Sequence, residues 1–160
     1  MSHLATSTTV DNKPLITDLE ILKRAAERLG LTFVGAPARF NTYGGSRPLS
    51  DHGAIGLLRL SESKSGRPPY DVAITPHRSG TGYNLLVDTF DSQIRGVVGD
   101  NTWLQNGGTI VCPKLMMEYY MEIERTVAAE NGDEVEFTTN EDGSVTSHTY
   151  PALTRLQEIY

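Results

Sequence analysis

The sequence predicts an α+β fold, with a small antiparallel sheet of about five to seven strands packed against two main helices. A C-terminal hairpin and a short terminal helix are expected to follow. Three observations predict this class: two segments repeat apolar residues at helical spacing, several short β-rich runs lie between turn formers, and 15 Gly and 8 Pro residues indicate many turns. A chain of 160 residues buries a core as one unit, so we expect a single domain over residues 1–160.

The first helix is predicted to begin at Thr17 and to stop at Gly30. Thr17 and Glu20 have the spacing of a capping box, and Gly30 supplies a left-handed stop. A strand is expected directly afterwards, over residues 31–34. The apolar stripe of the helix consists of Leu19, Leu22, Ala26 and Leu29.

The middle of the chain is predicted to alternate between strands and turns. Residues 35–50 are rich in Gly, Pro, Asn and Ser, so they are expected to form a loop with at most a short strand near 39–43. Further strands are expected at 53–60, 70–75 and 82–88, the last two forming an antiparallel hairpin. Residues 91–111 have no consistent period and predict a long irregular segment, which in a compact domain is more often functional or mobile.

A second long helix is predicted to open at Pro113 and to end at Asn131-Gly132. A final hairpin is expected over 134–139 and 144–149, around the turn Asp142-Gly143. Pro151 is expected to open the terminal helix. One face of the second helix carries Leu115, Tyr119, Ile123 and Val127, with Met116 and Tyr120 beside them.

The net charge of −6 is distributed unevenly. Residues 1–80 carry 10 Lys and Arg against 7 Asp and Glu, whereas residues 81–160 carry 4 against 13. An acidic surface repels phosphate, which makes nucleic acid an unfavoured partner. The acidic half is either a solvated face or a docking surface for a basic partner.

The single cysteine, Cys112, excludes an intrachain disulfide. With no visible signal peptide and no apolar run of about 20 residues, we expect a cytoplasmic protein without a membrane partner. Cys112 lies beside Pro113 at a helix N-terminus, a position that would lower the pKa of a nucleophilic thiol. That interpretation is weak, and no catalytic residue, metal or cofactor is predicted.

A ligand-binding site is the alternative to a purely structural role for the polar residues of the loops. Gly80-Thr-Gly82 precedes a strand rather than a helix, which indicates a hairpin turn and not a phosphate loop. A pocket would require several candidates to converge, and nucleic-acid binding would require Arg39, Arg47, Arg59 and Arg67 to share one face. The ligand-binding candidates are His3, Asp51, His52, His77, Tyr83 and Asp88.

An interface on the second helix is also predicted, because Met and Tyr occupy more than one of its faces and both are enriched where proteins meet. The candidate interface residues are Trp103, Met116, Met117, Tyr120 and Met121.

A series of short matches runs in order through residues 1–149. They are Met1-Ser-His3, the Asp18-Leu-Glu20 to Gly30 helix, Asp51-His52 with Ala54-Ile55, Tyr70-Asp71, Gly82-Tyr-Asn-Leu-Leu-Val-Asp88, Leu115, Tyr119, Gly132 and Asp142-Gly-Ser144. In these residues the chain resembles the DUF1257 family, the bacterial and phage relatives of the plastid-encoded Ycf35 protein. It departs from the family at Ser50, where Cys is frequent, at Val87, where an aromatic is usual, and at the additional Gly53.

The family has no established activity to carry over. The resemblance implies a component of an assembly that includes an AAA-type ATPase. Together with the absence of a catalytic motif, it favours a non-enzymatic binding or adaptor protein, as a homo-oligomer or in a partner complex. The alternative is a small-ligand or metal-binding protein, enzymatic or ligand-sequestering, that uses the His52, His77 and Tyr83 region.

Overall fold

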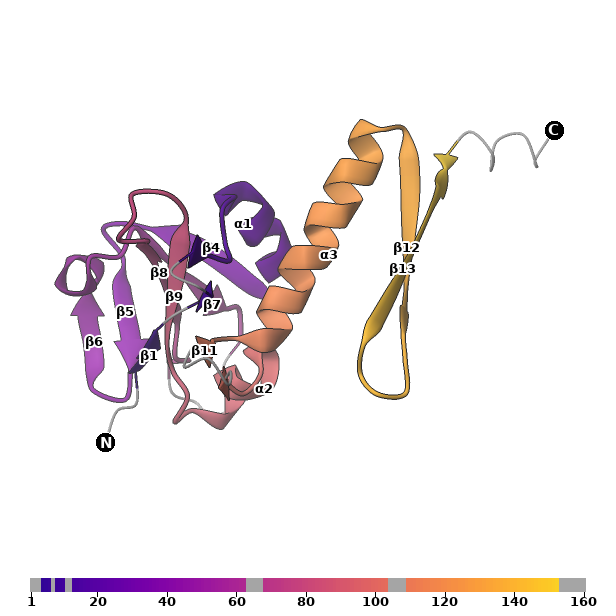
Figure 1. Cartoon of the computed structure of the whole chain (residues 1–160). Coiled ribbons are helices and arrows are strands. Elements are labelled where there is room, and N and C mark those ends of the chain that lie inside the picture. Colours follow the sequence, from indigo (N-terminus) through magenta and orange to yellow (C-terminus); the bar gives the residue numbers. More distant parts are fainter. Residues whose placement is uncertain (1–3, 7, 11–12, 63–67, 104–108, 153–160) are drawn as a thin grey trace. The chain divides into compact units, whose positions relative to one another are not determined.

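The structure is a computed structural model, which describes residues 4–6, 8–10, 13–62, 68–103 and 109–152 (Figure 1). It is an α+β fold, as predicted. The chain forms two compact units, residues 1–119 and 120–160, and the boundary between them falls inside one long helix. Each unit is described by itself, and the single domain expected over 1–160 stays a prediction.

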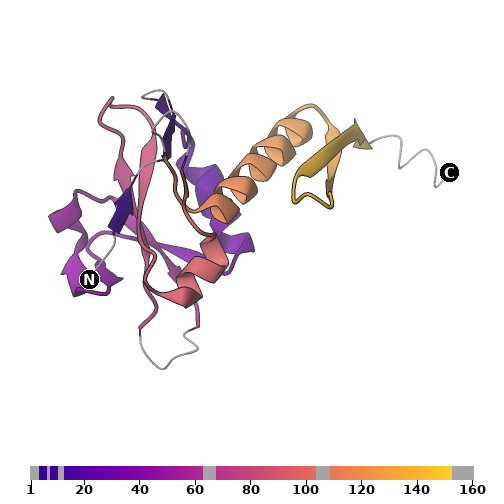
Figure 2. The same cartoon turned by 60° about the horizontal axis from the view of Figure 1, so that its bottom comes forward.

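The main sheet of the first unit has five antiparallel strands in the order β1-β9-β8-β7-β4. Figure 2 shows β8 and β9 side by side, joined by the turn after residue 76, which confirms the predicted hairpin. Five strands is the lower end of the predicted range. The strands are β1 (Leu4–Thr6), β4 (Leu31–Gly35), β7 (Gly56–Leu60), β8 (Val72–Pro76) and β9 (Tyr83–Asp88).

Helix α1 (Leu19–Arg28) follows the prediction except at its start. The N-cap is Asp18 and not Thr17, because the Asp18 side chain accepts a hydrogen bond from the Ile21 N–H at 3.1 Å. Gly30 has the expected left-handed backbone, with φ of +81°. Of the predicted stripe, Leu22 and Ala26 are buried, and Leu19 and Leu29 are half-buried. Ile21 and Ala25 complete the buried face.

The segment expected to be loop contains a two-stranded hairpin, formed by β5 (Arg39–Thr42) and β6 (Gly45–Pro48). The 3-10 turn η1 (Leu49–His52) follows it. Phe40 of β5 is fully buried, and its cluster anchors the hairpin on the main sheet. The buried members of that cluster are Phe40, Leu49, Leu57 and Ala73.

The prediction of a long irregular segment at 91–111 is wrong in part. Asp91 caps a short helix, α2 (Ser92–Val98), whose Ile94 and Val98 are buried one turn apart. β10 (Thr102–Trp103) and β11 (Thr109–Ile110) join two N-terminal strands in a second sheet of order β10-β11-β2-β3. The N-terminal strands, which the sequence analysis did not predict, are β2 (Thr8–Val10) and β3 (Lys13–Pro14).

Helix α3 (Pro113–Glu130) begins and ends as predicted. In the first unit its Tyr119 is fully buried, and the Tyr119 hydroxyl accepts hydrogen bonds from the N–H groups of Thr17 (3.0 Å) and Asp18 (3.1 Å). These two bonds tie α3 to the start of α1. Val127, expected on the apolar face, is 49% exposed instead.

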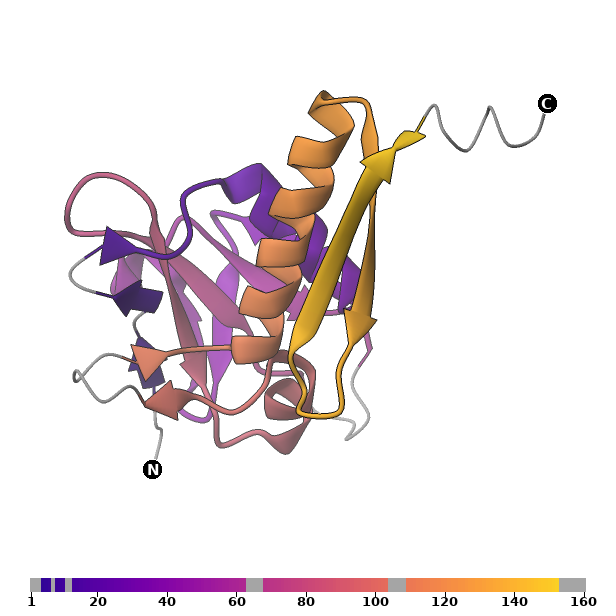
Figure 3. The ribbon, with the colours of Figure 1, turned by 45° about the vertical axis from the view of Figure 1, so that its right-hand side comes forward.

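The second unit contains the end of α3 and the predicted hairpin of β12 (Asp133–Thr139) and β13 (Val145–Pro151), which Figure 3 shows as a long two-stranded ribbon. Arg125 of α3 lies 4.8 Å from the centre of the Phe137 ring, a cation–π contact that joins helix and hairpin. The terminal helix expected after Pro151 lies outside the described residues. Over the described part of the chain, no helix combines the length and apolarity needed to cross a membrane.

Candidate ligand-binding site

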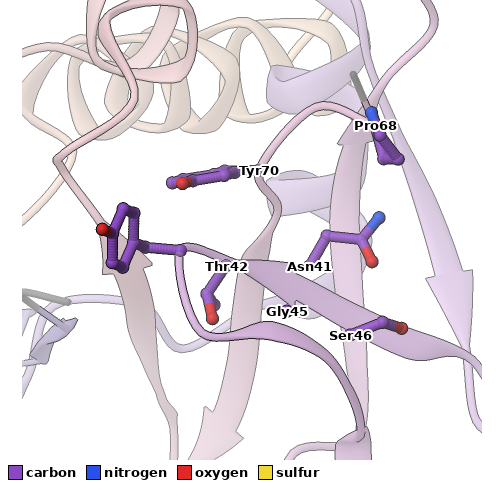
Figure 4. A pocket seen from close by; sticks show the side chains of 7 residues that line it. Asn41, Thr42, Gly45, Ser46, Pro68 and Tyr70 are labelled. Atoms are coloured by element: carbon purple, nitrogen blue, oxygen red, sulfur yellow. The ribbon is translucent and has the colours of Figure 1, made fainter. Parts of the chain in front are cut away.

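A pocket of about 320 Å³ lies at the turn of the β5–β6 hairpin (Figure 4). The hairpin supplies most of its lining, and the segment before β8 supplies the rest. In Figure 4 the Tyr70 ring lies on one side, opposite Thr42 and Ser46. The lining residues are Asn41, Thr42, Tyr43, Gly45, Ser46, Pro68 and Tyr70.

The hairpin turns at Tyr43 and Gly44, between the paired residues Thr42 and Gly45. Gly45 has φ of +100°, a backbone conformation that other residues rarely adopt. Next to the turn, the guanidinium of Arg39 donates to the Ser46 hydroxyl at 3.0 Å and to the Ser46 carbonyl at 2.9 Å. The two strands are therefore crosslinked through side chains as well as through their backbone pairing.

Asp71 anchors the middle of β5. Its carboxylate is fully buried and accepts from the Asn41 N–H at 2.8 Å and from two nitrogens of Arg59, each at 2.9 Å. The Asp71 N–H donates in turn to the Asn41 carbonyl, and Arg59 also donates to the Arg39 carbonyl at 2.7 Å. Burial raises the pKa of Asp71 above its usual value, and the hydrogen bonds from Arg59 and Asn41 oppose that rise.

Asp88 anchors the turn itself. Its fully buried carboxylate, at the end of β9, accepts from the Tyr43 N–H at 3.1 Å through one oxygen and from the Phe90 N–H at 3.0 Å through the other. The rings of Tyr43 and Phe90 pack edge to face, with centres 4.9 Å apart, although their side chains remain 51% and 56% exposed. One buried group thus fixes the backbone beneath two exposed aromatic rings.

The pocket has the chemistry of binding by stacking and by neutral hydrogen bonds. Two tyrosine rings and Pro68 provide apolar surface, while an amide and two hydroxyls provide donors and acceptors. None of the seven lining residues that the structure describes is an acid, a base or a thiol. Asp71 and Asp88 lie behind the hairpin, where they hold its backbone.

Those predicted ligand-binding residues that the structure describes are distributed over η1, the turn between β8 and β9, and the two ends of β9. His77 and Tyr83 flank the same turn, but Asp88 lies at the other end of β9 from Tyr83, about 17 Å away along the strand. His52 packs edge to face against Phe40, with ring centres 5.3 Å apart.

His77 and Asp51 differ in their exposure to solvent. His77 is buried, and its Nδ1 accepts from the Ser79 N–H at 3.1 Å within the turn. Asp51 is exposed on η1, and His3 lies outside the described residues. Within the described ranges, no three His, Cys, Asp or Glu side chains are placed to share a metal ion.

The structure also contradicts the Cys112 nucleophile and bears on the proposed arginine face. Cys112 is fully buried and burial raises the pKa of its thiol, so the nucleophile interpretation is wrong. Arg39 pairs with Pro48, so Arg47 lies on the opposite face of the hairpin. The Arg59 guanidinium is bound to Asp71, and Arg67 lies outside the described residues. The required arginine face is therefore not formed by Arg39, Arg47 and Arg59.

The candidate interface residues occupy different environments. Met116 is 2% exposed and belongs to the core of the first unit, so it presents no surface to a partner. Met117 and Tyr120 are 40% and 43% exposed, and Met121 is half-buried. Trp103 lies in β10, and its side chain is outside the described part of the structure.

Sequence reasoning missed Tyr43 and Tyr70, although both carry a local signal. Tyr43 sits in the run Asn41-Thr-Tyr-Gly-Gly-Ser46, and Tyr70 follows Pro68-Pro69. An aromatic residue among turn formers is held at the surface by the turn, because the neighbouring residues cannot continue a buried strand.

Comparison with known proteins adds no relative: no family model, no curated protein and no solved structure matches the chain.

Proposed function

We propose that the chain is a non-enzymatic binding or adaptor protein and that the pocket of the β5–β6 hairpin holds a segment of its protein partner. The observation that carries this proposal is the buried Asp88, which fixes the backbone of Tyr43 and Phe90 while leaving both rings exposed. Exposed large apolar rings cost solvation free energy, and a rigid backbone beneath them reduces the entropy lost on binding.

The composition of the pocket supports binding rather than catalysis. Aromatic rings surrounded by small polar groups are enriched at protein interfaces, where tyrosine contributes a large contact area with little loss of rotamer freedom. The resemblance to the DUF1257 family supports an assembly with an AAA-type ATPase as the setting. A small neutral ligand is the second candidate, because about 320 Å³ is within the range of small-molecule sites.

The test is a quantitative pull-down from the native host with the full chain as bait. The variant carries Tyr43→Ala and Tyr70→Ala, and the matched control is Val127→Ala, which removes an apolar side chain of comparable exposure on α3. Circular dichroism establishes that all three baits are folded. The proposal expects a partner that the wild type and the control retain and that the double variant loses.

The contrary result is equally definite. If every retained protein binds the three baits alike, the pocket is not the docking site. If in addition light scattering shows a monomer and nothing co-purifies with the wild type, the adaptor function itself is refuted.

A further inference from the structure

We infer that the segment held by this pocket is a proline-containing stretch, bound as an extended polyproline II chain. The inference rests on the proposed function and adds the chemistry of the ligand. It follows from the charge of the pocket, the geometry of its rings and the donors beside them.

The pocket selects a ligand that is neutral where it makes contact. Its seven described lining residues carry no charge. Behind it, the oxygens of Asp88 accept from backbone N–H groups, and those of Asp71 accept from the Arg59 guanidinium and the Asn41 N–H. The nearest cation along β5, Arg39, donates twice to Ser46. A phosphate or carboxylate group would leave water without a compensating ion pair in this lining, which is unfavourable.

The rings of Tyr43 and Phe90 are inclined apolar surfaces at the hairpin turn. Their planes meet at an angle of 65°, and the two side chains are 51% and 56% exposed. Tyr70 lies on one side of the pocket (Figure 4). The pyrrolidine ring of proline is a compact apolar group, and proline-rich segments dock in grooves that aromatic rings line in this way.

The polar side chains of the lining match a further requirement of a polyproline II segment, which is hydrogen-bond donors for its carbonyl groups. A polyproline II chain makes no internal hydrogen bonds, so its carbonyl groups need donors from water or from a partner. The Asn41 amide and the hydroxyls of Thr42 and Ser46 are donors at the pocket wall. The extended conformation is also preformed in the free peptide, which lowers the entropic cost of docking in a small site.

The experiment measures binding of a fluorescein-labelled decaproline to the full chain by fluorescence polarisation. A Gly-Ser decapeptide with the same label is the control peptide. Maltohexaose represents the alternative class of neutral ligand and is added as a competitor. The protein variants are Tyr43→Ala, Tyr70→Ala and Tyr70→Phe, with Val127→Ala on α3 as the control. We expect decaproline to bind saturably, with a Kd below about 1 mM. The Kd of the Gly-Ser peptide is expected to be at least about tenfold higher.

The variants separate stacking from other contacts. Tyr43→Ala and Tyr70→Ala are expected to weaken decaproline binding at least about tenfold. Tyr70→Phe keeps the ring and Val127→Ala leaves the pocket intact, so both are expected to remain within about twofold of the wild type. Circular dichroism confirms the fold of each variant.

Three outcomes overturn the inference: equal binding of the two peptides, binding of maltohexaose in place of decaproline, or decaproline binding that the tyrosine variants leave unchanged. They leave the proposed function standing if the pull-down partner still depends on Tyr43 and Tyr70. Loss of that dependence refutes the proposed function as well.

Discussion

Asparagine in place of Asp88 is the sharpest perturbation of the candidate site. The substitution keeps the size of the side chain but replaces one acceptor oxygen with an NH2 donor. In the wild-type protein, both oxygens accept backbone hydrogen bonds, from Tyr43 at 3.1 Å and from Phe90 at 3.0 Å. In Asp88→Asn only one of these bonds survives, and the other backbone N–H faces a second donor in a fully buried position.

The expected loss of stability follows from these two bonds. A hydrogen bond to a charged group contributes about 1.5–3 kcal/mol, and one between neutral groups contributes about 1 kcal/mol. The lost bond costs about 1.5–3 kcal/mol and the change of the other to a neutral bond costs about 0.5–2 kcal/mol, so the free energy of unfolding is expected to fall by about 2–5 kcal/mol. Because the lost anchor lies at the hairpin turn, amide hydrogen exchange is expected to accelerate first at Tyr43 or Phe90.

Urea unfolding at neutral pH, followed by circular dichroism, measures this difference. Asp91→Asn is the matched control, because Asp91 accepts one bond from the Gln93 N–H as the N-cap of α2 and asparagine caps helices about equally well. The control is expected to stay within about 0.5 kcal/mol of the wild type. If Asp88→Asn is equally neutral, or Asp91→Asn is equally costly, Asp88 is not the anchor of the aromatic pair.

Three further predictions concern the scaffold around the site. Tyr119→Phe removes the acceptor of the Thr17 and Asp18 N–H groups and is expected to cost about 1–3 kcal/mol in urea unfolding; an unchanged midpoint contradicts this. Gly96→Ala, inside α2 with open space around the added carbon, is expected to raise stability by about 0.5–1 kcal/mol, and a lowered Tm counts against it. Burial raises the pKa of Asp71, so a carbon-13 titration of its carboxyl group is expected to have a midpoint above 3.8. The folded state then binds this proton more tightly than the unfolded state does, so the contribution of Asp71 to the free energy of unfolding falls as pH rises from 3.8 through that midpoint. A midpoint of 3.8 or lower contradicts this prediction.

The elements that sequence reasoning located are those with local causes. The capping and periodicity of α1, the turn of the β8–β9 hairpin and the Asp142-Gly143 turn all act within a few residues, and each element lies close to its predicted position. The same local causes were insufficient at α2, whose seven residues include Gly96 and offer only two apolar positions for the core. A helix that short owes its stability to packing that periodicity does not reveal.

The candidate site could not be predicted from short stretches of sequence either, because the contacts that hold it join residues far apart in the chain. Asp71 binds Asn41, which is 30 residues away in the sequence, and Asp88 binds Tyr43, which is 45 residues away. The residues next to each aspartate therefore do not indicate its role. Asp88 was singled out as a ligand-binding residue, whereas its oxygens hold the hairpin backbone. His77 and His52 show the reverse situation, because each makes a contact within its own turn or core cluster, His77 with Ser79 and His52 with Phe40.

The pairing of the N-terminal strands bears on the time course of folding. Leu4 lies opposite Asp88 in the main sheet, and Thr8 lies opposite Ile110 in the second sheet. Until β9 and β11 have been synthesised, β1 lacks its partner β9, and β2 can pair with β3 but not yet with β11. Contacts so distant in sequence slow folding, whereas the β12–β13 hairpin closes around a few residues and forms early. The β12–β13 hairpin is thus expected to form soon after both of its strands are synthesised, whereas β1 and β2 complete their pairing only after β9 and β11 have been made.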